Sequence, residues 1–192
     1  MTPAGIRHVP VTWSVEFLEL EGKNVRAADP TGTSDPYVVF SGPACVCEAS
    51  GEPVLKTLNP RWQRSKLPTL QLCAASPRVL AEDHLLLCVM DRDTVTADDL
   101  LGCAVVSLRS LRFAGGADPF SDVWPSDGSP AIASFDLPIL YGGVKLGSIS
   151  GTLAFSRAAP LTLDELYRGR NLLRKTGTIG SVLRRALTIT SP

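Results

Sequence analysis

Short runs of hydrophobic residues recur along most of the chain and are separated by clusters of Gly, Pro, Asp and Ser. The run at 11–20 (VTWSVEFLEL) begins with a clean alternation, and its hydrophobic members are Val11, Trp13, Val15 and Phe17. A period of two residues is typical of a β-strand with one buried side. Similar runs predict further strands at about 35–41, 44–57 (interrupted), 66–73, 84–91, 101–108, 131–140 and 146–156. The pattern therefore predicts an all-β fold, an eight-stranded antiparallel β-sandwich.

One long segment interrupts this pattern. Residues 112–130 are rich in turn-forming residues and contain Phe120 and Trp124. We expect a surface loop whose two aromatic side chains pin it to the sandwich, although an exposed aromatic pair would indicate a contact site instead.

The C-terminal residues have helical rather than strand periodicity. Thr162 and Glu165 have capping-box spacing ahead of a helical run to about Lys175. Hydrophobic residues then recur on one helix face, at Ile179, Val182, Leu183, Ala186 and Leu187. A helix this short is not stable alone in water, so it should dock on the sandwich, on a partner protein through residues 160–190, or on an anionic membrane.

These patterns divide the chain into an N-terminal tail (1–10), a β-sandwich (11–158) and a basic amphipathic helical tail (159–192). The charge is zero overall but uneven, since residues 1–158 hold 13 Lys and Arg against 17 Asp and Glu, and residues 159–192 hold 6 against 2. A nucleic-acid-binding domain would show a basic stripe. The acidic body therefore argues against a nucleic-acid partner.

Residue counts exclude several other classes. The five cysteines have no CxxC spacing and no nearby histidines, which argues against a zinc site and favours a reducing compartment. No hydrophobic run approaches the roughly 18 residues that span a bilayer, so any membrane contact should be peripheral. The chain has two histidines and no GxSxG, phosphate-loop or dinucleotide motif, so we do not expect an enzyme.

Aspartates in two short windows are the strongest chemical signal, namely Asp29, Asp35, Asp91, Asp93 and Asp99. Single aspartates in loops commonly form turns. At the end of a predicted strand, however, Asp91 and Asp93 leave the same face, where two like charges repel unless a cation compensates them. Calcium takes six to eight oxygen ligands, mostly carboxylates and carbonyls. The residue types alone leave a metal site and solvated turns as alternatives.

Three motifs together resemble the C2 domain, the calcium- and phospholipid-binding module of protein kinase C, synaptotagmins and phospholipases. They are LEGKNVRAADPTGTSDPYVVF (20–40), KTLNPRW (56–62) and DRDTVTADDLLG (91–102), and the resemblance covers roughly residues 11–157. It implies the type II permutation of that sandwich. It also implies two or three Ca²⁺ ions held by the five aspartates, by the backbone carbonyls of Ala28 and Arg92, and by the Thr96 hydroxyl. Asp98 is expected to be an outer charge.

The resemblance further implies a cytoplasmic protein that a rise in calcium recruits to anionic phospholipid membranes as a peripheral protein. Lipid contacts are expected at Thr31, Arg61, Arg64 and Val95. The third loop has one valine and no basic residue at its tip (Thr94 to Ala97), so insertion should be shallow. The alternative is a calcium-independent protein-interaction or scaffold domain that uses the C-terminal tail or the 112–130 loop.

Overall fold

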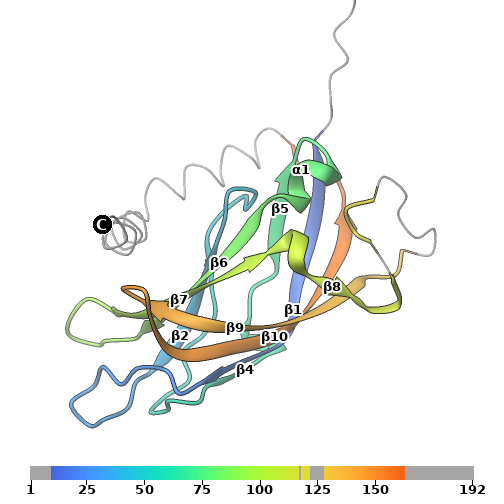
Figure 1. Ribbon diagram of the computed structural model, residues 1–192. Coiled ribbons are helices and arrows are strands. Elements are labelled where there is room, and N and C mark those ends of the chain that lie inside the picture. The colour runs from blue at the N-terminus through green and yellow to red at the C-terminus, as the bar shows by residue number, and fades with distance from the viewer. Residues whose placement is uncertain (1–9, 117, 122–127, 163–192) are drawn as a thin grey trace, which may run out of the picture.

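The computed structural model describes residues 10–116, 118–121 and 128–162. These residues form ten strands, one α-helix and three short 3-10 helices (Figure 1). In chain order the elements are β1 (Val11–Lys23), β2 (Pro36–Ser41), β3 (Ala49–Ser50), β4 (Arg61–Gln63), η1 (Arg64–Lys66), β5 (Leu70–Ala74), α1 (Pro77–Ala81), β6 (His84–Asp91), β7 (Asp99–Ser107), η2 (Leu108–Ser110), β8 (Arg112–Phe113), η3 (Ala114–Gly116), β9 (Ala131–Tyr141) and β10 (Val144–Ala158). Residues 163–192 of the predicted helical tail and Trp124 lie outside the described residues. No helix in the described ranges is long and apolar enough to cross a bilayer.

The strands are antiparallel and connect in the order β3-β2-β6-β7-β9-β10-β1-β4, with β5 also paired to β1 and β8 to β9. The first strand, β1, lies beside the last strand, β10, with Thr12 opposite Ala158. The sheet folds over so that β2 faces β1 across a shared core, where the Phe17 and Phe40 rings lie 4.5 Å apart between centroids. The predicted all-β sandwich of C2 type is confirmed.

The alternation in the first strand produces the core as expected. Trp13, Val15 and Phe17 are at most 1% exposed. Trp62 of β4, the strand beside β1, is buried in the same core, and its indole N–H donates to the Pro36 carbonyl at 3.3 Å. Burying large aromatic rings contributes most of the hydrophobic stabilisation, and this indole also satisfies its polar atom.

The region between β2 and β5 differs from the prediction. The expected strand at 44–57 contributes only the two-residue β3 and an isolated bridge between Cys45 and Leu72. Residues 51–60 form a loop instead, and β4 starts at Arg61. This segment contains Gly51, Pro53 and Pro60, which limit its participation in a strand ladder.

A short helix, α1, was not predicted because it has a single turn and no long hydrophobic period. Its start signal is nevertheless present in the sequence: Ser76 is the N-cap, and Pro77 occupies the first helical position. The Ser76 hydroxyl accepts a hydrogen bond from the Val79 amide at 3.3 Å.

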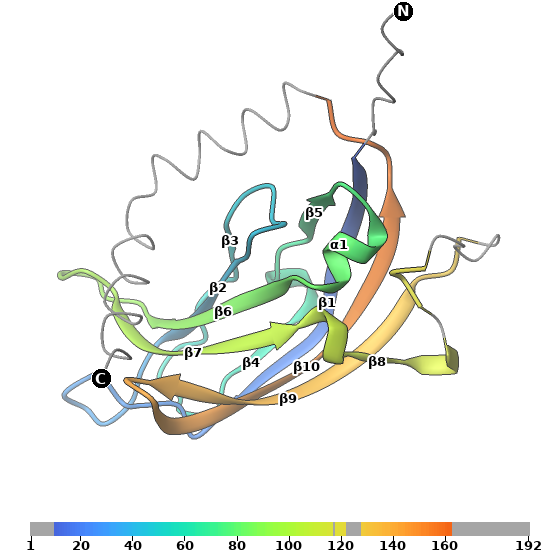
Figure 2. The ribbon, with the colours of Figure 1, turned by 45° about the horizontal axis from the view of Figure 1, so that its top comes forward.

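The two ends of the sandwich carry different features (Figures 1 and 2). The β1–β2 loop, the β6–β7 loop and the β9–β10 hairpin extend from one end, and β8 with the described residues that follow it lies at the other. In that distal segment Phe120 packs edge-to-face on Phe113 and Phe155, with centroids 5.7 and 6.0 Å apart. Phe120 therefore pins this loop to the core as expected.

Candidate functional site

Three loops meet at the first end of the sandwich, which we call the loop end. The first loop is 24–35, the second is 51–60 and the third is 92–98. Strand register places Asp91 opposite both Pro36 of β2 and Asp99 of β7. The Asp35 amide donates to Asp91 Oδ1 at 2.5 Å, and the Arg92 amide donates to the Asp35 carbonyl at 3.1 Å. The two aspartate windows, 56 positions apart, are therefore in direct contact.

The Asp91 carboxyl is buried near the carboxylates of Asp29 and Asp93. Asp91 is 1% exposed. Burial raises the pKa of its carboxyl, the charges of Asp29 and Asp93 raise it further, and the hydrogen bond from the Asp35 amide opposes the shift. Because these carboxylates repel one another, a cation among them would relieve an electrostatic cost.

Hydrogen bonds within the first loop hold Asp29 in a tight turn. The Asp29 amide donates to the Thr33 carbonyl at 3.1 Å, and the Gly32 amide donates to the Asp29 carbonyl at 3.0 Å. Gly32 has a φ of 80°, which a side chain would disfavour. The hydroxyls of Thr31 and Thr33 lie 2.9 Å apart at the exposed tip.

Ser34 organises the same loop and was not singled out from the sequence. The residue is fully buried, and its hydroxyl donates to the Arg26 carbonyl at 3.0 Å and accepts from the Ala28 amide at 3.0 Å. The position that follows Ser34 is the ligand candidate Asp35. A serine directly before the candidate ligand Asp35 is the sequence signal that could have identified Ser34.

The third loop is organised by Asp98. Its carboxylate accepts from the Tyr37 hydroxyl at 2.6 Å and from the Asp93 amide at 3.0 Å, and Arg92 Nε lies 3.7 Å away. Burial and then the Asp98 hydrogen bond raise the pKa of the Tyr37 hydroxyl above its ordinary value. The Arg92 guanidinium also stacks over the Tyr37 ring at 5.1 Å. Asp98 is thus a structural acceptor, a role that depends on Tyr37 from another strand.

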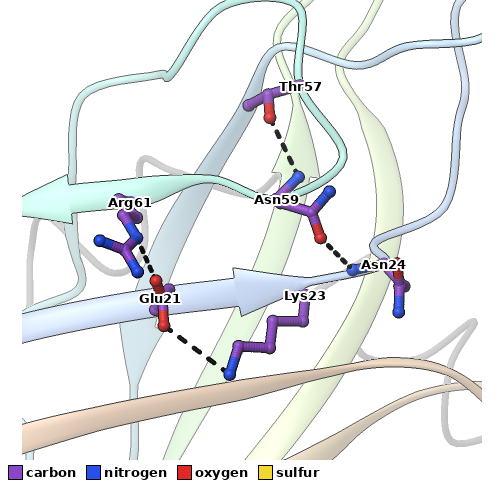
Figure 3. A network of polar contacts seen from close by, with 6 residues as sticks. All are labelled: Glu21, Lys23, Asn24, Thr57, Asn59 and Arg61. Atoms are coloured by element: carbon purple, nitrogen blue, oxygen red, sulfur yellow. Dashed lines mark hydrogen bonds and ion pairs between the residues drawn. The ribbon is translucent and has the colours of Figure 1, made fainter.

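The second loop is tied to the first by the KTLNPRW segment (Figure 3). Asn59 Oδ1 accepts from the Asn24 amide at 3.0 Å, while the Asn59 amide donates to Thr57 Oγ1 at 3.0 Å. The Lys56 amide donates to Asp35 Oδ1 at 2.6 Å. The second loop therefore fixes the position of one candidate metal ligand.

The expected lipid-contact residues occupy two settings. Thr31 and Val95 are exposed at loop tips, and Val95 is 93% exposed. Arg61 forms an ion pair with Glu21, whose other oxygen lies 3.9 Å from Lys23 Nζ, and Arg64 pairs with Glu16 (Figure 3 shows the first pair). The two arginines lie along β4 and η1 rather than at a loop tip.

The donor chemistry of the loop end fits calcium, since it offers carboxylate, carbonyl and hydroxyl oxygens. In the described part of the chain, no three or more His, Cys, Asp or Glu side chains are already gathered as a metal site. The carboxylates of Asp35 and Asp91 accept hydrogen bonds from backbone amides instead. Thr96 is exposed in the third loop, and Asp99 is exposed at the start of β7.

Comparison with known proteins gives a consistent picture. Residues 13–121 match the C2 domain family. The chain is 31% identical over 105 residues to Fer-1-like protein 4 of Mus musculus, covering 55% of this chain and 5% of that protein. It is 34% identical over 100 residues to Tricalbin-1 of Saccharomyces cerevisiae, covering 52% of this chain and 8% of that protein. The chain thus spans a small fraction of the curated relatives it matches.

A solved structure, a C2 domain of plant Extended Synaptotagmin 1, has a TM-score of 0.53 and 16% identity to the chain. The alignment covers 80% of this chain and 99% of that domain, which shows a shared fold. The family match extends from the first core strand through all three loops, and covers more than half of the sequence. The chain therefore belongs to the C2 domain family.

Proposed function

We propose that this C2 domain binds calcium at the loop end and that calcium recruits the protein from the cytoplasm to anionic phospholipid membranes. A C2 domain is a binding module, typically without enzymatic activity, and related C2 domains bind phospholipid membranes. The observation that carries the proposal is the contact between Asp35 and Asp91, together with the charges of Asp29 and Asp93 beside it. A calcium-binding role accounts for this accumulation of negative charge at one end of the sandwich.

In the proposed site the five aspartates supply carboxylate oxygens. The ligand set also includes the backbone carbonyls of Ala28 and Arg92 and the Thr96 hydroxyl, enough for two or three ions. Bound calcium would supply positive charge and open coordination positions for lipid oxygens. Without a cation, the five aspartates repel an anionic membrane surface and so disfavour binding to it. Such a surface favours nearby basic residues by ~1 kcal/mol each.

Lipid contact in this proposal occurs through the loop tips, at Thr31 and Val95. Arg61 and Arg64 contribute where phosphate oxygens replace their glutamate partners. Such an exchange is feasible because exposed ion pairs contribute only about 0–1 kcal/mol. Both arginine side chains are more than half exposed, at 82% and 63%.

The test is Asp93→Asn, which removes one charge in the third loop at nearly constant volume. We expect calcium affinity, measured by titration calorimetry, to fall by roughly tenfold or more because one charged ligand is lost. Sedimentation with phosphatidylcholine vesicles, with and without phosphatidylserine, should show a parallel loss of calcium-dependent binding.

A matched control is Asp136→Asn, since Asp136 is exposed in the middle of β9 and changes the net charge equally. This control should bind calcium and vesicles like the parent. Equal binding by Asp93→Asn and the parent would refute the ligand assignment. No calcium heat with the parent would favour a calcium-independent interaction domain.

A further inference from the structure

Exposed hydrophobic side chains are concentrated at the loop end. In the described ranges, seven large hydrophobic residues are exposed, and five of them belong to the loops or the hairpin at this end. These five are Leu55 (66% exposed), Val95 (93%), Leu140 (44%), Tyr141 (40%) and Val144 (60%). Exposed hydrophobic residues without a function are normally scattered singly over the surface. Their concentration at one end therefore indicates a region that contacts a partner or a membrane.

Three of the five residues form the tip of the β9–β10 hairpin, which is not one of the three aspartate-bearing or KTLNPRW loops. The turn residues Gly142 and Gly143 have φ values of 56° and 79°, as a two-residue type I′ turn requires. Tyr141 pairs with Val144 across the strands, and Leu140 pairs with Lys145. The turn therefore presents an aromatic and a β-branched side chain together at the tip.

The hairpin is held firmly against the loop end. Leu140 is in register with Cys103 of β7. At Gly102, an added Cβ would lie 2.6 Å from Ile139 Cγ2 and 3.0 Å from the Leu140 carbonyl oxygen, so the two backbones approach closely. A tip supported in this way is positioned before any ligand arrives, which lowers the entropy cost of binding.

A cation–π contact joins the hairpin to the first loop. The Arg26 guanidinium lies 5.2 Å from the centroid of the Tyr141 ring, and Arg26 Nη2 donates to the Leu100 carbonyl at 3.4 Å. Tyr141 thus adjoins the same surface as the aspartate loops. Tyrosine with a partly exposed ring is suited to the boundary between lipid headgroups and acyl chains.

The charge of the hairpin segment itself is also complementary to anionic lipid. Residues 137–150 include Lys145 and contain no Asp or Glu. Contact of this segment with an anionic surface therefore requires no metal to reverse its charge. A protein partner would need a larger continuous apolar area than these separate turn tips provide.

We propose that the tip of the β9–β10 hairpin, with Tyr141, Val144 and Lys145, is an additional membrane contact beside the calcium loops. This inference depends on the proposed membrane-binding function and extends it to a fourth segment. Tyr141 and Val144 enter the interface, while Lys145 lies among the anionic headgroups.

The test uses the full chain carrying Tyr141→Ser and Val144→Ser together. In saturating calcium, affinity for vesicles of phosphatidylcholine with phosphatidylserine should fall about tenfold, because two apolar contacts are removed. Calcium binding measured by calorimetry without vesicles should stay unchanged. Val105→Ser is the matched control, since Val105 is 52% exposed on β7 and should leave vesicle affinity unchanged.

The outcomes separate the two proposals. Weaker vesicle binding with unchanged calcium heat supports the hairpin contact. Parental vesicle affinity in the double variant, or an equal loss in Val105→Ser, overturns it and leaves the calcium-loop function standing. If the parent binds no vesicles in calcium, both proposals fail. If the double variant fails to fold, Val144→Ser alone can be compared with the parent, because Val144 is 60% exposed. The expected loss of vesicle affinity is then smaller.

Discussion

Replacing Ser34 with alanine tests whether the first loop depends on a single buried hydroxyl. The Ser34 hydroxyl bonds the Arg26 carbonyl and the Ala28 amide, both at 3.0 Å, and Ser34 is 0% exposed. The Ala28 amide keeps a second acceptor, the Thr33 carbonyl at 3.2 Å. The Arg26 carbonyl receives its hydrogen bond from Ser34, so this carbonyl bears most of the loss.

The magnitude follows from these contacts. Losing one net hydrogen bond costs about 0.5–1.5 kcal/mol, and leaving a buried polar group without a partner costs about 1–3 kcal/mol. We therefore expect Ser34→Ala to lower the free energy of unfolding by about 2 kcal/mol. For a chain of this size the melting temperature should fall by roughly 4–8 °C.

Urea unfolding followed by circular dichroism gives the free energy, and scanning calorimetry gives the melting temperature. Thr31→Ala is the control, because its hydroxyl is exposed and contacts the Thr33 hydroxyl at the loop tip. That control should change stability by less than about 0.5 kcal/mol. If Ser34→Ala and Thr31→Ala unfold at the same urea concentration, the buried hydroxyl does not stabilise the loop.

Two further changes test the packing of the sandwich. Gly102→Ala should destabilise the fold by about 2 kcal/mol or more, because Gly102 has a φ of 149° and an added Cβ would lie 2.6 Å from Ile139 Cγ2. Urea unfolding measures this loss. A free energy of unfolding equal to the parent's would contradict the close approach of β7 and β9. Burial raises the pKa of the Cys45 thiol to about 12, so the thiol stays protonated below that pH and the nucleophilic thiolate is scarce. Native-state iodoacetamide labelling at about pH 8 should therefore leave Cys45 largely unmodified by mass spectrometry, and labelling as fast as in urea would contradict the burial.

Much of the architecture could be predicted because it depends on neighbouring residues. The alternation from Val11 to Phe17 matches the buried face of β1, and the hydrophobic run ending at Asp91 matches β6. Elements without a long period, such as α1 and β4, were missed. A single turn or a three-residue strand contains too few positions to establish a period, and tertiary contacts decide whether it forms.

Some features of the candidate site could likewise be predicted from the sequence, and others could not. The five aspartates and their spacing could be identified from the sequence, and so could the exposed valine at position 95. The Tyr37–Asp98 hydrogen bond and the pairing of Arg61 with Glu21 could not be identified. Each joins residues from different strands or loops, so it depends on which strands become neighbours and in which register.

The strand pattern, the acidic windows and the family resemblance follow from the amino-acid sequence alone, because these are properties of residues close together along the chain. Only the folded chain brings Asp35 into contact with Asp91 and places Tyr141 beside Arg26 of the first loop. Sheet order and register bring these distant residues to one end of the sandwich. Alternation of hydrophobic and polar residues selects the buried face of each strand, whereas the packing of the strands into one fold sets which loops share a surface.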